Sequence, residues 1–208
     1  GVALNTLLAA SRRSRDIDLF HDTTEALSAS WAADRDALCR AGYDVKVTRD
    51  SASFVEAIVS HESGRTAAQW VRDSAYRFFP LVEDELLGLA LHPFDLATNK
   101  VLTIASRAEA RDWIDVLSCH TKLQPFGYLV WAACGKDPGY NPLSRLSYCA
   151  RRHFSHAEID DLEFEGPPPD AAKLGRSWHE ALHQAEAICA RLPSERVGTC
   201  VLAGDSEL

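Results

Sequence analysis

Several common features are missing from this sequence of 208 residues, and each absence narrows the class of protein. It has no methionine, and we therefore expect that a longer natural chain was trimmed or processed at its front. No apolar run approaches the roughly 18 residues that a membrane helix needs. Residues 1–10 lack the basic start and the cleavage site of a secretory signal. We expect a soluble, cytoplasmic protein that has no membrane partner.

The spacing of the cysteines and the net negative charge also narrow the class of protein. No two cysteines form a CxxC pair, and this wide spacing is typical of isolated thiols in a reducing cytosol, although an even count also allows disulfides. The net charge of −8 argues against a protein that binds nucleic acid over its whole surface. It still allows a local basic patch, and Arg12, Arg13 and Arg15 form one in the sequence.

The first half of the chain mixes helical and strand patterns. Residues 16–20 alternate, with Ile17 and Leu19 on one face and Asp16, Asp18 and Phe20 on the other. This is the periodicity of a strand. Thr23 or Thr24 can cap a helix that runs to about residue 40. Further strands are expected over residues 43–48, 54–60 and 67–73, and the last two are expected to form a hairpin.

The second half is almost wholly helical by its pattern. Proline and glycine breaks separate expected helices over residues 94–104, 108–123, 126–134, 143–154 and 170–192. The tail from Pro193 is expected to be loosely held. Together the patterns predict an α+β protein of two domains. The first, over residues 1–91, has a small mixed sheet with flanking helices, and the second, over residues 92–208, is helical.

Two carboxylates stand in the first expected strand. Alternation places Asp16 and Asp18 on the same face, with Cβ atoms roughly 6–7 Å apart. Such a pair suits Mg²⁺, and Asp73 at the end of another expected strand could complete the cluster. Three carboxylates that hold two Mg²⁺ ions form a clamp for in-line displacement at phosphorus. The alternative is that the pair is solvated on an exposed edge strand, because the D-x-D pattern is short and common.

The residues before this strand can bind phosphate. A helix that starts at Gly1 would offer its N-terminal amides to an anion. The following loop adds charged and hydroxyl donors beside the carboxylates. We therefore assign Gly1, Arg12, Arg13, Ser14 and Arg15 to the binding of a nucleoside triphosphate (NTP).

A second charged stretch lies among the expected helices of the second half. Lys100 falls near the end of one helix and Asp115 in the next, so the two converge if the helices form a hairpin. The lysine could then neutralise a triphosphate, and the aspartate could orient it. The competing interpretation is a surface salt bridge worth less than about 1 kcal/mol.

Another motif points to a different chemistry. Residues 179–183, His-Glu-Ala-Leu-His, match the H-E-x-x-H signature of zinc metallopeptidases, with Glu195 as a third ligand to consider. The longer metzincin signature fails, because Glu186 and Cys189 stand where glycine and histidine are needed. The apolar residues of this segment also form the buried stripe of an ordinary amphipathic helix. We favour a polar helix face over a zinc site.

Taken together, two blocks of the sequence resemble a known family. Residues 1–4, Gly-Val-Ala-Leu, and 13–20, Arg-Ser-Arg-Asp-Ile-Asp-Leu-Phe, are similar to the opening signature of the AbiEii/AbiGii-type toxin nucleotidyltransferases. That signature is a Gly-Gly-Thr-Ala-Leu-like start followed by R-S-x-D-(I/L)-D. Residues 92–100, His-Pro-Phe-Asp-Leu-Ala-Thr-Asn-Lys, then Arg107 and 111–115, Arg-Asp-Trp-Ile-Asp, resemble the family's second signature, D-L-A-x-N-K followed by an arginine and R-D-x-x-D.

The resemblance implies a polymerase-β-like nucleotidyltransferase core followed by a helical domain. It implies Mg²⁺ on Asp16 and Asp18, with Asp73 in the region of the third carboxylate, and an active site completed by Lys100 and Asp115. It further implies transfer of a nucleotide from an NTP to an acceptor such as the 3′ end of tRNA, and a toxin that pairs with an antitoxin protein. The sequence departs from the family at Val2, where threonine is usual. A catalytically inactive relative that only binds a partner is the remaining alternative.

Overall fold

The chain folds into two compact units. The structure, a computed structural model, describes residues 1–107, 109–151 and 153–202. One unit consists of residues 1–2 and 14–76, and the other of residues 3–13 and the chain from 77 onward. This division differs from the predicted boundary after residue 91, and it assigns the segment before the first strand mostly to the helical unit. No helix in the described part of the chain is long and apolar enough to cross a membrane.

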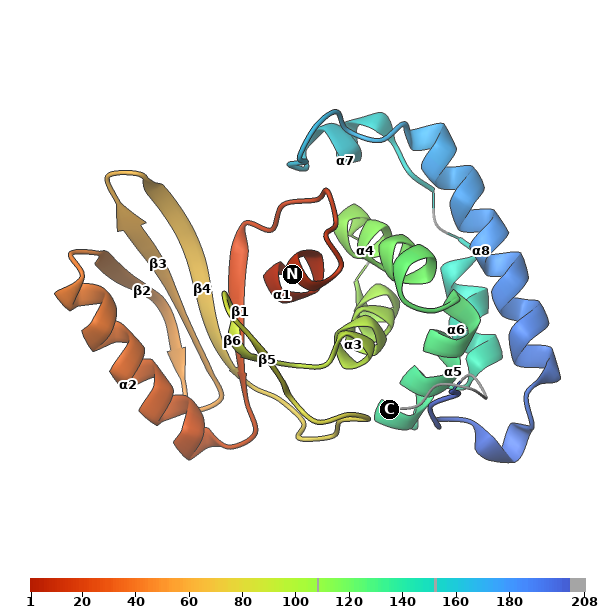
Figure 1. The fold of residues 1–208 in the computed structure, drawn as a ribbon, viewed down its shortest axis with the longest axis horizontal. Coiled ribbons are helices and arrows are strands. Elements are labelled where there is room, and N and C mark those ends of the chain that lie inside the picture. The colour runs from red at the N-terminus through yellow and green to blue at the C-terminus, as the bar shows by residue number, and fades with distance from the viewer. Residues whose placement is uncertain (108, 152, 203–208) are drawn as a thin grey trace. The chain divides into compact units, whose positions relative to one another are not determined.

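The first unit is a four-stranded mixed sheet with one long helix on one face (Figure 1). Its strand order is β1-β4-β3-β2, in which β1 runs parallel to β4 and the other neighbours are antiparallel. Thr23 caps α2 by accepting a hydrogen bond from the amide of Ala26, as its position predicts. The elements are β1 (Asp16–His21), α2 (Thr24–Arg40), β2 (Asp44–Ser51), β3 (Phe54–His61) and β4 (Gly64–Arg72).

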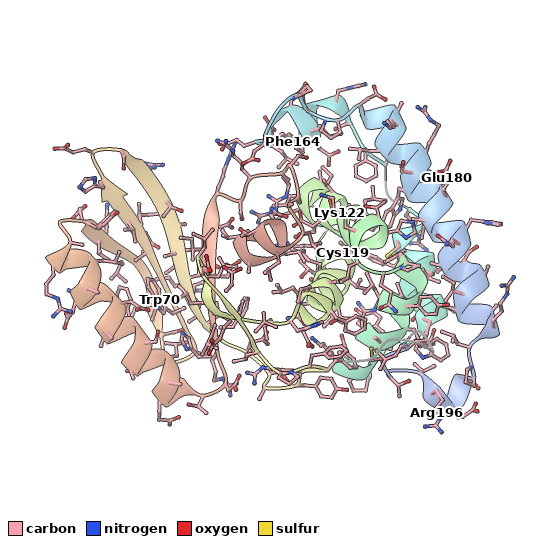
Figure 2. The ribbon with its side chains drawn as sticks, in the orientation of Figure 1. Trp70, Cys119, Lys122, Phe164, Glu180 and Arg196 are labelled. Atoms are coloured by element: carbon pink, nitrogen blue, oxygen red, sulfur yellow. The ribbon has the colours of Figure 1, made fainter. Side chains whose placement is uncertain are left out.

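A small core joins the sheet to α2. The largest side chain in it is Trp70 of β4, which is labelled in Figure 2 and is buried. Its ring makes an edge contact with Trp31 of α2 at 4.6 Å between centroids, and its Nε1 donates to Asp34 at 2.8 Å. Leu19 of β1 packs against the same core. The apolar half of the alternation in β1 therefore faces α2, which leaves Asp16 and Asp18 on the other face.

The second unit is a helical domain with one small hairpin. Figure 1 shows α8, the longest helix, running alongside α6 and α5. The elements are α1 (Val2–Leu7), β5 (Val82–Asp84), β6 (Gly88–Ala90), α3 (Pro93–Ser106), α4 (Ala110–Lys122), α5 (Phe126–Lys136), α6 (Pro142–Cys149), α7 (His156–Asp160), α8 (Ala171–Arg191) and the 3-10 turn η1 (Ser194–Arg196). The sequence patterns had predicted neither β5, β6 nor α7, and α6 ends before the predicted residue 154. Ala108, the predicted start of α4, lies outside the described residues.

Aromatic rings and one glycine hold the helical core together. Trp178 of α8 makes an edge contact with Trp113 at 4.7 Å and lies 5.1 Å from the ring of Phe126. A Cβ on Gly127 of α5 would come within 2.9 Å of the backbone of Ala185 in α8. Only glycine therefore permits this close approach of the two helices. The α+β class, with a small mixed sheet and a helical C-terminal region, is confirmed.

The structure tests two predictions, that the C-terminal segment is loosely held and that the cysteines are unpaired. Within the described part of the tail, residues 194–202 are held rather than loose. The indole Nε1 of Trp131 donates to the carbonyl of Arg196 at 2.9 Å, and the amide of Gly198 donates to the carbonyl of Trp131 at 3.1 Å. Gln124 also donates to Val201 at 2.9 Å. The prediction of unpaired cysteines is confirmed. All six lie in the described part and are free, at positions Cys39, Cys119, Cys134, Cys149, Cys189 and Cys200.

Candidate functional site

Register places the two strand carboxylates on one face of the sheet. Asp16 lies opposite Ala67 of β4 and Asp18 lies opposite Gln69, whereas the next pair, Leu19 and Trp70, packs toward α2. Paired residues in neighbouring strands point to the same side, and alternate residues point to opposite sides. The two acids therefore share the face that α2 does not cover.

Gly1 and Ser14 lie next to these acids within the first unit. The hydroxyl of Ser14 is 3.3 Å from Oδ1 of Asp16, and the nitrogen of Gly1 is 3.9 Å from Oδ2 of Asp18. A Cβ on residue 1 would clash with the Ser14 hydroxyl and lie 3.3 Å from its Cβ, so glycine is needed there. The side chain of Asp18 is 26% exposed, which leaves its oxygens accessible. Four of the predicted site residues thus gather in one place.

Asp73 does not join this group. Its amide donates to the carbonyl of His21 at 3.0 Å, so it lies level with the far end of β1. Because Gln69 is the partner of Asp18, Asp73 is four residues further along β4, or about 13 Å at the usual rise per residue. The register therefore does not bring Asp73 beside Asp16 and Asp18, and its role as a third ligand stays a prediction. The sequence could place Asp73 at a strand end, but it could not supply the offset between β1 and β4.

The position beside Asp18 is instead held by a neutral side chain. Gln69 Nε2 donates to Glu56 of β3 at 2.8 Å, and Thr48 of β2 donates to the same carboxylate at 2.7 Å. Within residues 1–107, 109–151 and 153–202, no three histidine, cysteine, aspartate or glutamate side chains are grouped closely enough to hold a metal ion. A cation at Asp16 and Asp18 would therefore need oxygens from its substrate or from water.

The three arginines of the basic loop before β1 have different surroundings. The amide of Arg13 donates to Glu163 at 2.8 Å, and its guanidinium lies 3.7 Å from Glu165 at the surface. Arg15 is exposed, and its carbonyl accepts a hydrogen bond from Thr66 at 2.9 Å. Arg12 is only 5% exposed. Its guanidinium binds a buried partner, and its contact with the triphosphate stays a prediction.

That partner is Asp115, in a charged cluster inside the helical unit. Arg12 binds it with two hydrogen bonds, from Nε to Oδ1 at 2.7 Å and from a terminal nitrogen to Oδ2 at 2.8 Å. Lys100 Nζ lies 3.0 Å from Oδ2 of the same carboxylate, as expected for a helix hairpin. Asp115 is buried, so the cluster is no surface salt bridge. Both carboxylate oxygens of Asp115 therefore contact cationic side chains of this chain.

Two further members of the cluster were not among the predicted site residues. Asp112 is fully buried and accepts from Lys100 Nζ at 2.7 Å and from Arg107 Nε at 2.8 Å. Burial alone would raise the pKa of Asp112, but the hydrogen bonds and charges of Arg107 and Lys100 outweigh it and lower that pKa. The signal was present in the sequence, because Asp112 and Asp115 are three residues apart and so share one helix face.

A buried thiol borders the same cluster. Cys119 of α4, labelled in Figure 2, is fully buried. Burial and the negative charge of Asp115 raise its pKa to about 12, against an opposing effect of Lys100. The thiol therefore stays protonated near neutral pH, and Cys119 acts as a packing residue rather than a nucleophile.

The H-E-x-x-H segment lies on the outside of α8. His179, Glu180 and His183 are exposed, and Figure 2 labels Glu180 on this helix. The ring of His179 is within 2.7 Å of the carbonyl of Gly175, one turn earlier. The opposite stripe of α8 packs into the core through Trp178 and its neighbours. These positions fit the polar face of an amphipathic helix.

Comparison with known proteins gives one result about the fold. No family model matches this chain, and no curated protein matches it. Among solved structures, the chain is similar to MenT4, a nucleotidyltransferase toxin from Mycobacterium tuberculosis H37Rv, with a TM-score of 0.60 and 19% sequence identity. The match covers 94% of this chain and 75% of that chain. The chain therefore shares its fold with this solved structure.

Proposed function

We propose that this chain is an Mg²⁺-dependent nucleotidyltransferase, which transfers a nucleoside monophosphate from an NTP to an acceptor hydroxyl. The observation that carries the proposal is the pair Asp16 and Asp18 on the face of β1 that does not pack on α2. The similarity in fold to the nucleotidyltransferase toxin MenT4 supports it. So does the resemblance of the two sequence blocks to the AbiEii/AbiGii-type toxins.

The donor set at Asp16 and Asp18 fits Mg²⁺. Both ligands are carboxylate oxygens, and Mg²⁺ usually binds through one or two carboxylates together with substrate phosphates. Two acids without a third protein ligand in the described part of the chain therefore suit a metal that arrives with its nucleotide. When bound, Mg²⁺ acts as a Lewis acid that neutralises phosphate charge. Since register removes Asp73 from the set, the proposal assigns the metal to Asp16 and Asp18.

The neighbouring residues of the first unit have roles in the same proposal. Gly1 and Ser14 lie against the two acids, and we assign them to contacts with the phosphate oxygens of the NTP. The hydroxyl of Ser14 can donate to a phosphate, and the absence of a side chain at Gly1 lets the backbone approach closely. Val2 offers no hydroxyl, so it adds no such contact.

Lys100 and Asp115 serve the reaction in different ways. Lys100 supplies positive charge that stabilises the leaving pyrophosphate, a form of electrostatic catalysis. Asp115 is buried and already holds Arg12 and Lys100, so it orients the lysine rather than touching the substrate. This differs from the role of substrate-orienting residue that the sequence predicted for Asp115.

The acceptor and the biological role complete the proposal. We propose the 3′ hydroxyl of an RNA, such as tRNA, as the acceptor, and toxin activity that an antitoxin protein restrains. These assignments follow the resemblance to the AbiEii/AbiGii-type toxins and agree with the toxin fold of MenT4. Growth arrest on induced expression, which Asp18→Asn relieves, is the expected cellular result.

The decisive experiment is label transfer in vitro. The purified chain is incubated with each α-³²P-labelled NTP, Mg²⁺ and total RNA, and we expect label on RNA with at least one NTP and none after EDTA treatment. Asp18→Asn should abolish transfer. Asp44→Asn is the matched control, because Asp44 is an exposed carboxylate on β2 of the same sheet, opposite Ser60. It should transfer label like the wild type.

Other outcomes would support the competing functions. Peptide cleavage that zinc restores after EDTA treatment, and that Glu180→Gln removes, would establish a metallopeptidase and overturn the proposal. Absence of label on RNA, protein and small acceptors with all four NTPs would indicate an inactive protein that binds a partner. Equal transfer by Asp18→Asn and the wild type would show that the metal assignment is wrong.

A further inference from the structure

Two buried carboxylates on α4, Asp112 and Asp115, each have an arginine of their own. Asp115 receives two hydrogen bonds from Arg12, at 2.7 and 2.8 Å. Asp112 receives two from Arg107, at 2.8 Å from Nε and 3.3 Å from a terminal nitrogen. Bidentate pairs of arginine with carboxylate are the strongest and most directional of such contacts. The guanidinium of one arginine thus neutralises the negative charge of each acid.

Lys100 lies between these two neutralised acids. Its Nζ is 2.7 Å from Oδ1 of Asp112 and 3.0 Å from Oδ2 of Asp115. The cluster has three cationic and two anionic side chains, so one positive charge is in excess. The outer pair of Glu109 and Arg111, 2.6 Å apart, adds one charge of each sign and leaves this excess unchanged.

The positions of the side chains also assign the excess positive charge to Lys100. An ammonium group has three N–H donors, and two of them are accounted for by Asp112 and Asp115. No other acceptor for Lys100 occurs among the residues that the structure describes. Its side chain is 12% exposed, whereas the carboxylates are almost fully buried. An anion can therefore reach the lysine but not the acids.

We infer that Arg12 and Arg107 are positioning residues, which neutralise the two acids so that Lys100 presents an uncompensated positive charge to a phosphate group. This inference rests on the proposed function, because the anion in question is the triphosphate or the pyrophosphate that leaves. Without the arginines, two carboxylates would neutralise one lysine and repel the substrate. With them, the acids hold the ammonium in place while its charge stays available.

The inference is tested by changing the charge of the cluster one unit at a time. The probe is pyrophosphate, titrated calorimetrically without Mg²⁺ at low salt. Arg12→Met removes the excess charge and should weaken binding about tenfold. Arg12→Met with Asp115→Asn removes one charge of each sign, and should restore the dissociation constant to within about threefold of the wild type. Arg12→Lys keeps the charge and should recover most of the affinity.

Controls separate the charge effect from damage to the fold. Arg176→Met removes an exposed arginine of α8, and should bind pyrophosphate like the wild type. Arg107→Met should weaken binding in the same direction as Arg12→Met. Near-ultraviolet circular dichroism of each variant shows whether the tertiary packing is intact, and the double variant covers the case in which Arg12→Met alone fails to fold.

Three results would overturn the inference. These are no binding of pyrophosphate by the wild type, unchanged binding by Arg12→Met, or a double variant that binds as weakly as Arg12→Met. The last result would mean that Arg12 contacts the anion itself. Failure of the proposed function is separate, because it is measured as label transfer. Binding in the expected order without transfer would leave the charge arrangement standing and remove the enzymatic role.

Discussion

The two units of the molecule each contain a pair of aspartates, and the two pairs differ in their burial and in their partners. Asp16 and Asp18 alternate along a strand, and the side chain of Asp18 is 26% exposed. Asp112 and Asp115 lie three residues apart on a helix, are almost fully buried, and bind three cationic side chains. The same residue type therefore serves different ends in the two places.

The difference shows how to distinguish an acid that awaits a ligand from one that is already satisfied. A buried charge must be paired, since desolvation costs several kcal/mol per ion. Asp112 and Asp115 meet this condition with residues of the chain, so they have no need of a metal. The side chain of Asp18 is 26% exposed and has no arginine or lysine partner among the residues that the structure describes, and it thus retains capacity for an external cation. In the proposed function, the strand pair therefore binds the metal and the helical cluster gives electrostatic support.

The largest expected effect separates activity from stability at the strand pair. Asp18→Asn should reduce label transfer at least a thousandfold, because one of two metal ligands is lost. Its unfolding free energy should be unchanged or slightly higher, since the change removes repulsion between neighbouring carboxylates. Activity is measured by label transfer to RNA and stability by urea unfolding.

Asp16→Asn should behave in the same way, and Asp44→Asn should alter neither property. If Asp18→Asn lost activity only in proportion to a loss of stability, the strand pair would be structural, and the contrast between the two units would fail.

The next effect is a loss of stability in the helical unit. Asp112→Ala should lower the unfolding free energy by about 3 kcal/mol, because it leaves Lys100 with one partner fewer in a buried site. Glu109→Ala is the matched control, since Glu109 is about half exposed and its ion pairs with Arg111, at 2.6 Å, and Arg107, at 3.8 Å, are open to solvent. It should cost less than about 1 kcal/mol. Equal losses in the two variants would show that burial does not set the strength of these pairs.

The stabilisation from Asp112 should depend on pH in a defined direction. The pKa of Asp112 in the folded protein lies below its ordinary value of 3.8, through Arg107 and Lys100 acting against burial. Its stabilisation is therefore fully present above about pH 4 and is lost as the pH falls through the lowered pKa. Urea unfolding of the wild type and Asp112→Asn from pH 7 to pH 3 should show a difference that narrows toward acid pH. A difference that widens there would contradict the charge assignment.

Sequence patterns predicted the local elements of this protein better than its long-range pairing. The alternation in β1, the Thr23 cap and the helical stretches all depend on neighbouring residues, and they were found close to their predicted bounds. Strands of three residues, such as β5 and β6, are too short to show a period. The position of Asp73 depends on the register between strands some 50 residues apart, and no local pattern contains that offset.

The same limit explains the outcome for Arg12. Within a run of arginines and serines, it has the composition of a solvated loop. Its burial follows from contacts with Asp115, 103 residues away along the chain. Lys100 and Asp115 could be paired from sequence because a helix hairpin brings them together over a short separation. Charge pairs across a short helix hairpin were predictable, and the pair of Arg12 with Asp115, far apart along the chain, was not.

The smallest expected effect concerns the neutral core of the first unit. Trp70 is buried, and its Nε1 donates to Asp34 of α2 at 2.8 Å. Asp34→Ala should cost about 1–2 kcal/mol, because it leaves a buried indole N–H without an acceptor. The control is Asp36→Ala, an exposed acid on the same helix, which should stay within about 0.5 kcal/mol of the wild type. An equal fall in the free energy of unfolding for Asp34→Ala and Asp112→Ala would contradict this ranking. In that case a single hydrogen bond would stabilise the sheet unit as much as the ion-pair network stabilises the helical unit. The distinction between the two units would then rest on metal binding alone.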